Sequence, residues 1–162
     1  MPIPDPVPET GFLPPGDWSA TLSEVEDRFG TRPRRRRERF SDAKYVIEQL
    51  WERGATGVWI GGSFVTTKDL PRDVDVVFEA PAATQPDTWG IYSGRPAYRK
   101  MMQERHHVDL WRLPAYQTPR AGIGQRLTIK EFWEEKDGVA KGLVEVIHEP
   151  RTDKKVTDDD QE

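Results

Sequence analysis

The chain has 162 residues, of which 35% are hydrophobic and 32% charged, with a formal net charge of −4 and no cysteine. This length fits one domain, and the lack of cysteine excludes disulfides and thiolate metal ligands. No apolar run approaches the ~20 residues of a membrane-spanning helix, and the start MPIPDPVPE lacks the charged and apolar regions of a signal peptide. We therefore expect a cytoplasmic protein without a membrane partner.

The two ends of the chain differ in composition from the rest. Four prolines alternate with other residues at the start, which favours a flexible extended arm over residues 1–10. Residues 149–162 are acidic and poor in apolar side chains, a composition typical of disorder. The pattern thus predicts one folded domain over residues 11–148.

Two helices are predicted in the first third of the domain. After a turn at residues 12–16, Thr21 and Glu24 have the spacing of a capping box that opens a short helix ending at Phe29. Pro33 is typical of the first turn of a longer helix, whose apolar residues recur at three- to four-residue intervals until Gly54 ends it. Its apolar face is expected to cover a sheet.

Six arginines lie within eight residues at the start of this second helix. Cations are unfavourable there because the helix dipole places positive charge at the N-terminus. One interpretation is a patch for nucleic acid or triphosphate; the other is a solvated face partly neutralised by neighbouring acids. The candidate patch consists of Arg34, Arg35, Arg36 and Arg37.

The remaining elements follow from periodicity and capping signals. In chain order they are a strand over 58–60, a strand over 74–78, a loop over 80–95, a helix over 96–105, a strand around Asp109, a loop over 113–125, a helix over 129–136 and a strand over 139–147. Helices that alternate with strands predict an α/β (α+β) domain with a mixed, mainly four-stranded sheet.

The most informative stretch joins the first two of these strands. Gly61 and Gly62 predict a sharp turn, and Ser63 is placed to cap a short helix whose N-terminus favours an anion such as phosphate. Asp73 and Asp75 are two residues apart, so a strand directs both carboxylates to one face. Paired carboxylates suit Mg²⁺ or Mn²⁺, which prefer oxygen ligands.

The Gly-Gly-Ser turn, followed after nine residues by Asp-Val-Asp, resembles the signature of the DNA polymerase beta-like nucleotidyltransferase superfamily. The resemblance implies that Gly62 and Ser63 hold a nucleoside triphosphate (NTP) and that Asp73 and Asp75 hold the metal. It also implies a third metal ligand on a later strand, for which the sequence offers Asp109. Two nearby cations are candidates for phosphate contact, Lys68 and Arg72.

Within this superfamily the chain is similar to small stand-alone bacterial proteins of the DUF6932 type, from Gly11 to about Ile147. The shared features are LPPG near the start, a helix ending in RFG, GSFVT before the aspartates and a late EFW helix. The resemblance implies a minimal nucleotidyltransferase core and Mg-dependent transfer of a nucleoside monophosphate from ATP or another NTP to RNA, such as tRNA, or to protein. It also suggests a toxin–antitoxin or phage-defence setting.

Two other functions stay open on the sequence. One is a catalytically weak nucleotide-binding or antitoxin-like protein that acts through a cognate partner. The other is a nucleic-acid-binding module that uses the arginine run, for which binding would depend steeply on salt but not on metal.

Overall fold

The computed structural model of the chain describes residues 3–67, 70–113, 117–119, 126–128, 135–136 and 139–149. A mixed five-stranded sheet with the order β1-β9-β2-β3-β4 forms its centre. The strands are β1 (Gly16–Thr21), β2 (Gly57–Gly61), β3 (Val74–Glu79), β4 (Val108–Leu113) and β9 (Gly142–Ile147). The pairs β1–β9 and β3–β4 are parallel, and β2 is antiparallel to both β3 and β9.

The fifth strand corrects the predicted mainly four-stranded sheet. β1 follows the Pro14-Pro15 pair, and it contains Asp17 and Ser19, residues that favour turns over strands. Its hydrogen bonds go to β9, near the other end of the domain. The strand therefore depends on a long-range pairing that leaves little local signal in the sequence.

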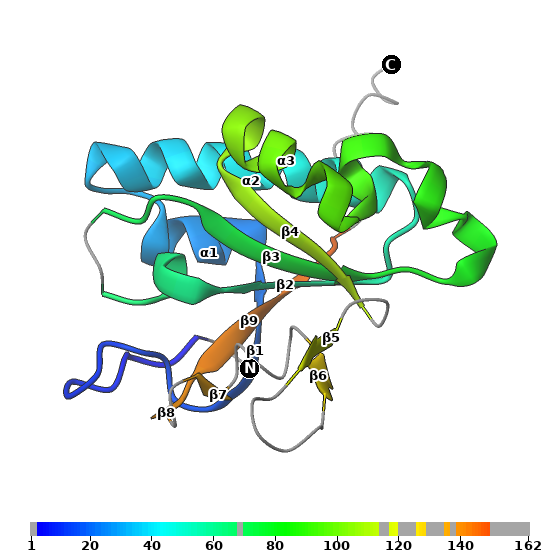
Figure 1. Ribbon diagram of the computed structural model, residues 1–162. Coiled ribbons are helices and arrows are strands. Elements are labelled where there is room, and N and C mark those ends of the chain that lie inside the picture. The colour runs from blue at the N-terminus through cyan, green and yellow to red at the C-terminus, as the bar shows by residue number, and fades with distance from the viewer. Residues whose placement is uncertain are drawn as a thin grey trace, which may run out of the picture.

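Three α-helices lie on one side of the sheet (Figure 1), namely α1 (Leu22–Phe29), α2 (Arg34–Glu52) and α3 (Arg99–His106). The capping box that opens α1 is confirmed, because the Glu24 amide donates to Thr21 Oγ1 at 3.1 Å and the Thr21 amide donates to Glu24 Oε1 at 2.8 Å. Pro33 lies at the N-cap of α2, and Gly54 ends the helix as predicted, because it follows the C-cap Arg53 with φ +106°.

The core lies between these helices and one face of the sheet. The predicted apolar face of α2 is confirmed, with all of its members buried. From α2 and α3 the core receives Phe40, Ala43, Val46, Ile47, Leu50 and Met102, and from β3 and β4 it receives Val74, Val76, Phe78, Val108 and Leu110. Because side chains alternate along a strand, the residues between these strand positions point to the opposite face.

The segment predicted as a loop over 80–95 folds into successive short 3₁₀ turns. They are η2 (Ala82–Thr84), η3 (Pro86–Thr88) and η4 (Gly90–Ser93), followed by η5 (Pro96–Tyr98) at the start of α3. Trp89 anchors them by stacking on Phe78, with ring centroids 5.6 Å apart. On α3, Met102 is buried, whereas Met101 is 39% exposed.

The start of the described chain contacts the domain through Ile3 and Pro4. Ile3 is buried, and the Arg28 guanidinium donates to the carbonyl oxygens of Ile3 and Pro4 at 2.5 and 2.7 Å. The acidic tail beyond residue 149 lies outside the described residues.

Two short hairpins precede β9, formed by β5 (Gln117–Pro119) with β6 (Arg126–Thr128) and by β7 (Glu135–Lys136) with β8 (Val139–Ala140). The helix predicted over 129–136 is wrong at its end, because residues 135–136 pair as a strand, and residues 129–134 lie outside the described part. In the part of the chain that the structure describes, no helix combines the length and apolar character needed to cross a membrane.

Candidate functional site

Two of the predicted carboxylates lie side by side on neighbouring strands. β3 and β4 are parallel, and their register pairs Asp75 directly with Asp109. Parallel strands in register direct paired side chains to the same face, with backbones about 4.8 Å apart. The α-helices cover one face of the sheet (Figure 1). Both aspartates alternate with the core residues of that face, so they lie on the opposite face.

The glycine turn lies against the first of these carboxylates. Gly62 has φ +70°, and a Cβ atom at this residue would come within 2.0 Å of Asp75 Oδ2. Ser63 follows inside a four-residue 3₁₀ turn, η1 (Gly62–Val65), whose N-cap is Gly61. The prediction that Ser63 caps this short helix is therefore wrong, because Gly61 is the N-cap. The turn is also too short to carry a helix dipole, but the close approach of backbone and carboxylate is present.

The third aspartate lies at the entrance to β3. Asp73 is half-buried in the bend immediately before the strand, and Arg72 beside it is exposed. The remaining predicted phosphate contact, Lys68, lies outside the described residues.

Two arginines of α2 fix the backbone on both sides of the site. Arg36 is buried, and its Nη1 and Nη2 atoms donate to the carbonyl oxygens of Phe64 and Thr66 at 2.6 and 2.8 Å. Arg39 Nε donates to the carbonyl oxygen of Arg72 at 2.9 Å, directly before Asp73. The three-residue spacing places both on the same face of α2, so the helix holds the glycine turn and the entrance to β3.

This arrangement changes the interpretation of the arginine run. Arg34 pairs with Glu38 at 3.1 Å, Arg37 is exposed, Arg35 is half-buried and Arg36 points into the domain. The four residues therefore do not form one continuous exposed patch. The sequence alone could not separate Arg36 from its neighbours, because its partners are backbone carbonyl groups distant in the chain.

Sequence reasoning did not identify Arg99, the first residue of α3. Its Nε and Nη2 atoms donate to Oδ1 and Oδ2 of Asp109 at 2.7 and 3.0 Å. The hydrogen bond to Asp109 raises the pKa of Arg99 above its ordinary value, and the charges of Asp75 and Asp73 act in the same direction. Arg99 is thus within electrostatic reach of all three predicted metal ligands.

The three aspartates do not form a complete metal-binding group as they stand. Among the described residues, no three or more Asp, Glu or His side chains come together with the geometry of a metal site. Asp109 has both oxygens engaged by Arg99; the other two predicted ligands are Asp73 and Asp75. Carboxylate oxygens are donors that suit a hard divalent cation, but the predicted arrangement of three carboxylates around a metal is not present among the described residues.

Two histidines lie behind the site at the end of α3. His107 has φ +55° and caps α3, and its Nδ1 lies 3.1 Å from Asp42 Oδ2, which also accepts from Arg39 Nη1 at 3.1 Å. The carbonyl oxygen of His107 accepts from the Val74 amide at 2.9 Å. His107 therefore supports the start of β3 through its backbone.

His106 gives a testable pH dependence. It stacks on Tyr45 with ring centroids 5.5 Å apart, and burial lowers its pKa below the usual 6.5, against the opposing charge of Asp42. Since the unfolded chain holds the proton more tightly, the stability contributed by neutral His106 is complete above about pH 6.5 and is lost as pH falls below it. NMR titration of the imidazole is expected to give a midpoint below 6.5, and urea unfolding of His106→Gln should lose this pH dependence; a midpoint above 6.5 would contradict the assignment.

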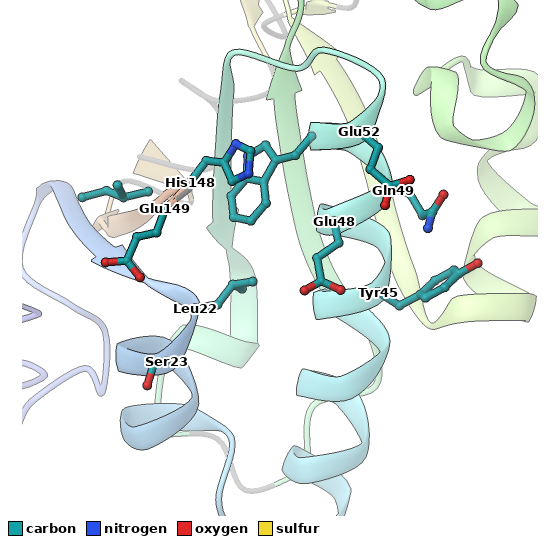
Figure 2. Close-up of a pocket in the computed structure, with 10 residues that line it drawn as sticks. Leu22, Ser23, Tyr45, Glu48, Gln49, Glu52, His148 and Glu149 are labelled. Atoms are coloured by element: carbon teal, nitrogen blue, oxygen red, sulfur yellow. The ribbon is translucent and has the colours of Figure 1, made fainter. Parts of the chain in front are cut away.

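A separate cavity of about 360 Å³ lies between α1, α2 and the end of β9. Glu48 from α2 and Glu149 from the segment after β9 face each other across it (Figure 2), and Glu52 also lines it. Trp51 also lines the cavity and stacks on His148, with ring centroids 4.2 Å apart. These carboxylates would repel a phosphate group, so this cavity does not suit the ligand predicted for the Asp75–Asp109 face.

Comparisons with known proteins identify a family but no characterised relative. Neither the curated proteins nor the solved structures gave a match. One family model, described as a family of unknown function (DUF6932), matches residues 6–147. This span covers β1 to β9 and every predicted site residue. The chain therefore belongs to the DUF6932 family.

Proposed function

We propose that this protein is a metal-dependent nucleotidyltransferase that moves a nucleoside monophosphate from an NTP to a hydroxyl group of RNA, such as tRNA, or of protein. The observation that carries the proposal is the register pairing of Asp75 with Asp109, with the Asp75 carboxylate packed on Gly62. Acidic side chains and a close backbone turn, placed together on one face of a sheet, supply both a cation site and room for a phosphate group.

The residues have separate roles in this proposal. Asp73 and Asp75 would hold a Mg²⁺ or Mn²⁺ ion, which supplies charge neutralisation for the triphosphate. Gly62 lets the backbone approach the ligand, and Ser63 offers a hydroxyl to a phosphate oxygen. Exposed Arg72 lies beside Asp73 and is available for a further phosphate contact. Arg36 and Arg39 act only through the backbone that they fix.

The test is transfer of label from each of the four α-³²P NTPs, with Mg²⁺, into total tRNA and into cell-extract protein. Wild type is expected to label one acceptor class, and EDTA or Asp75→Asn is expected to reduce the label to background. Asp87→Asn is the matched control, because this carboxylate lies outside the site, paired with Arg112 at 2.8 Å and 67% exposed.

The acceptor that takes up the label identifies the substrate class. RNA labelling would favour a tRNA-modifying activity, and protein labelling would favour modification of a partner such as a cognate toxin or antitoxin. If wild type and Asp75→Asn label neither acceptor while both chains are folded, the transferase proposal fails.

A further inference from the structure

Two-metal phosphoryl-transfer sites hold a second cation, and in this chain Arg99 engages the carboxylate, Asp109, that is predicted to bind metal. Its guanidinium engages both oxygens of Asp109 in a bidentate pair, at 2.7 and 3.0 Å. The Asp109 side chain is only 14% exposed, whereas Arg99 is 45% exposed and approaches it from the solvent side. A divalent ion at Asp109 would have to compete for the same oxygens against a geometry that suits carboxylates especially well.

A second contact holds Arg99 in this place. The central guanidinium carbon lies 4.8 Å from the ring centre of Trp111, which follows Asp109 by two residues on β4 and shares its face. Such a cation–π contact adds to the ion pair. Because a guanidinium does not lose its proton in proteins, Arg99 stays charged at any pH at which the chain is folded.

We infer that Arg99 replaces the second metal ion: the protein binds one divalent ion, at Asp73 and Asp75, and Arg99 supplies the positive charge at Asp109. Nε and Nη2 are engaged with Asp109, which leaves Nη1 to donate to a phosphate oxygen of the nucleotide. The inference rests on the proposed function, since it concerns the same ligand, and it assigns Asp109 to holding Arg99 instead of a metal.

The experiment counts the ions bound by the full-length protein. Mn²⁺ is titrated into wild type, Asp109→Asn, Arg99→Lys and Arg99→Gln, and free Mn²⁺ is followed by its EPR signal. Wild type is expected to bind one ion per chain, and Asp109→Asn is expected still to bind one ion, with an affinity lowered by roughly 10- to 100-fold because the outer-shell pair with Arg99 is broken. Arg99→Gln should admit a second ion at Asp109, whose partner cation is removed, while Arg99→Lys keeps the charge and should bind one.

Three results would overturn the inference. They are two ions bound by wild type, no ion bound by Asp109→Asn, or a single ion in Arg99→Gln. Circular dichroism of each variant excludes misfolding as the cause. NTP transfer accompanied by two bound ions would leave the proposed function standing and remove only the role of Arg99. One ion in wild type and two in Arg99→Gln, without any NTP transfer, would support the role of Arg99 but contradict the proposed transferase function. If wild type binds no Mn²⁺, both the role of Arg99 and the proposed function fail.

Discussion

Gly62→Ala is expected to lower the free energy of unfolding by about 2–3 kcal/mol and the affinity for Mn²⁺ by roughly tenfold. The glycine has φ +70°, where an alanine is strained, and the new Cβ would lie 2.0 Å from Asp75 Oδ2 and 2.7 Å from its Cγ. Either the turn or the carboxylate must move, and both belong to the proposed site. Urea unfolding and Mn²⁺ titration measure the two effects.

Gly90→Ala is the matched control for this variant. Gly90 also has a positive φ, +61°, but a Cβ there meets no atom within 4 Å. Gly90→Ala is expected to lower the free energy of unfolding only by the backbone strain, about 1 kcal/mol. The affinity for Mn²⁺ is expected to stay unchanged. Equal effects of the two substitutions on stability and on metal affinity would show that the contact between Gly62 and Asp75 does not shape the site.

Arg36→Met is expected to lower the free energy of unfolding by about 3 kcal/mol. Methionine can fill the space of the arginine stem, but it cannot donate to the carbonyl oxygens of Phe64 and Thr66, which accept from Arg36 at 2.6 and 2.8 Å. Each buried acceptor left without a donor costs about 1–3 kcal/mol. The loss should appear as a lower urea midpoint, together with weaker Mn²⁺ binding because the glycine turn loses its support.

Arg37→Met separates this role from charge alone. Arg37 is the next residue in the same run, is exposed, and makes a long contact of 3.4 Å to the Thr31 carbonyl oxygen. Removal of its charge is expected to change stability by no more than about 0.5 kcal/mol. If Arg36→Met unfolds at the same urea concentration as Arg37→Met, the hydrogen bonds of Arg36 do not stabilise the folded domain as expected here.

Local patterns in the sequence predicted those elements that are stabilised by near neighbours. The capping box of Thr21 and Glu24 opens α1, and the apolar repeat of α2 lies in the core. β3 and β4 were found as apolar runs with aspartates at positions that alternate with core residues. The predicted helix over 129–136 had an equally good local signal, but its residues 135–136 pair with β8, a contact that the capping pattern does not encode.

The amino-acid sequence by itself determined the acidic strand pair, the glycine turn beside it and the mixed α/β character of the domain, because these follow from side-chain periodicity and glycine placement. Only the tertiary structure decided that Asp75 faces Asp109, that Arg36 and Arg39 fix the backbone around them, and that Arg99 engages Asp109. Strand register and long-range contacts depend on how separate elements pack. The local sequence around an arginine that pairs with a carboxylate or backbone carbonyl inside the domain therefore does not differ from that around an arginine exposed to solvent.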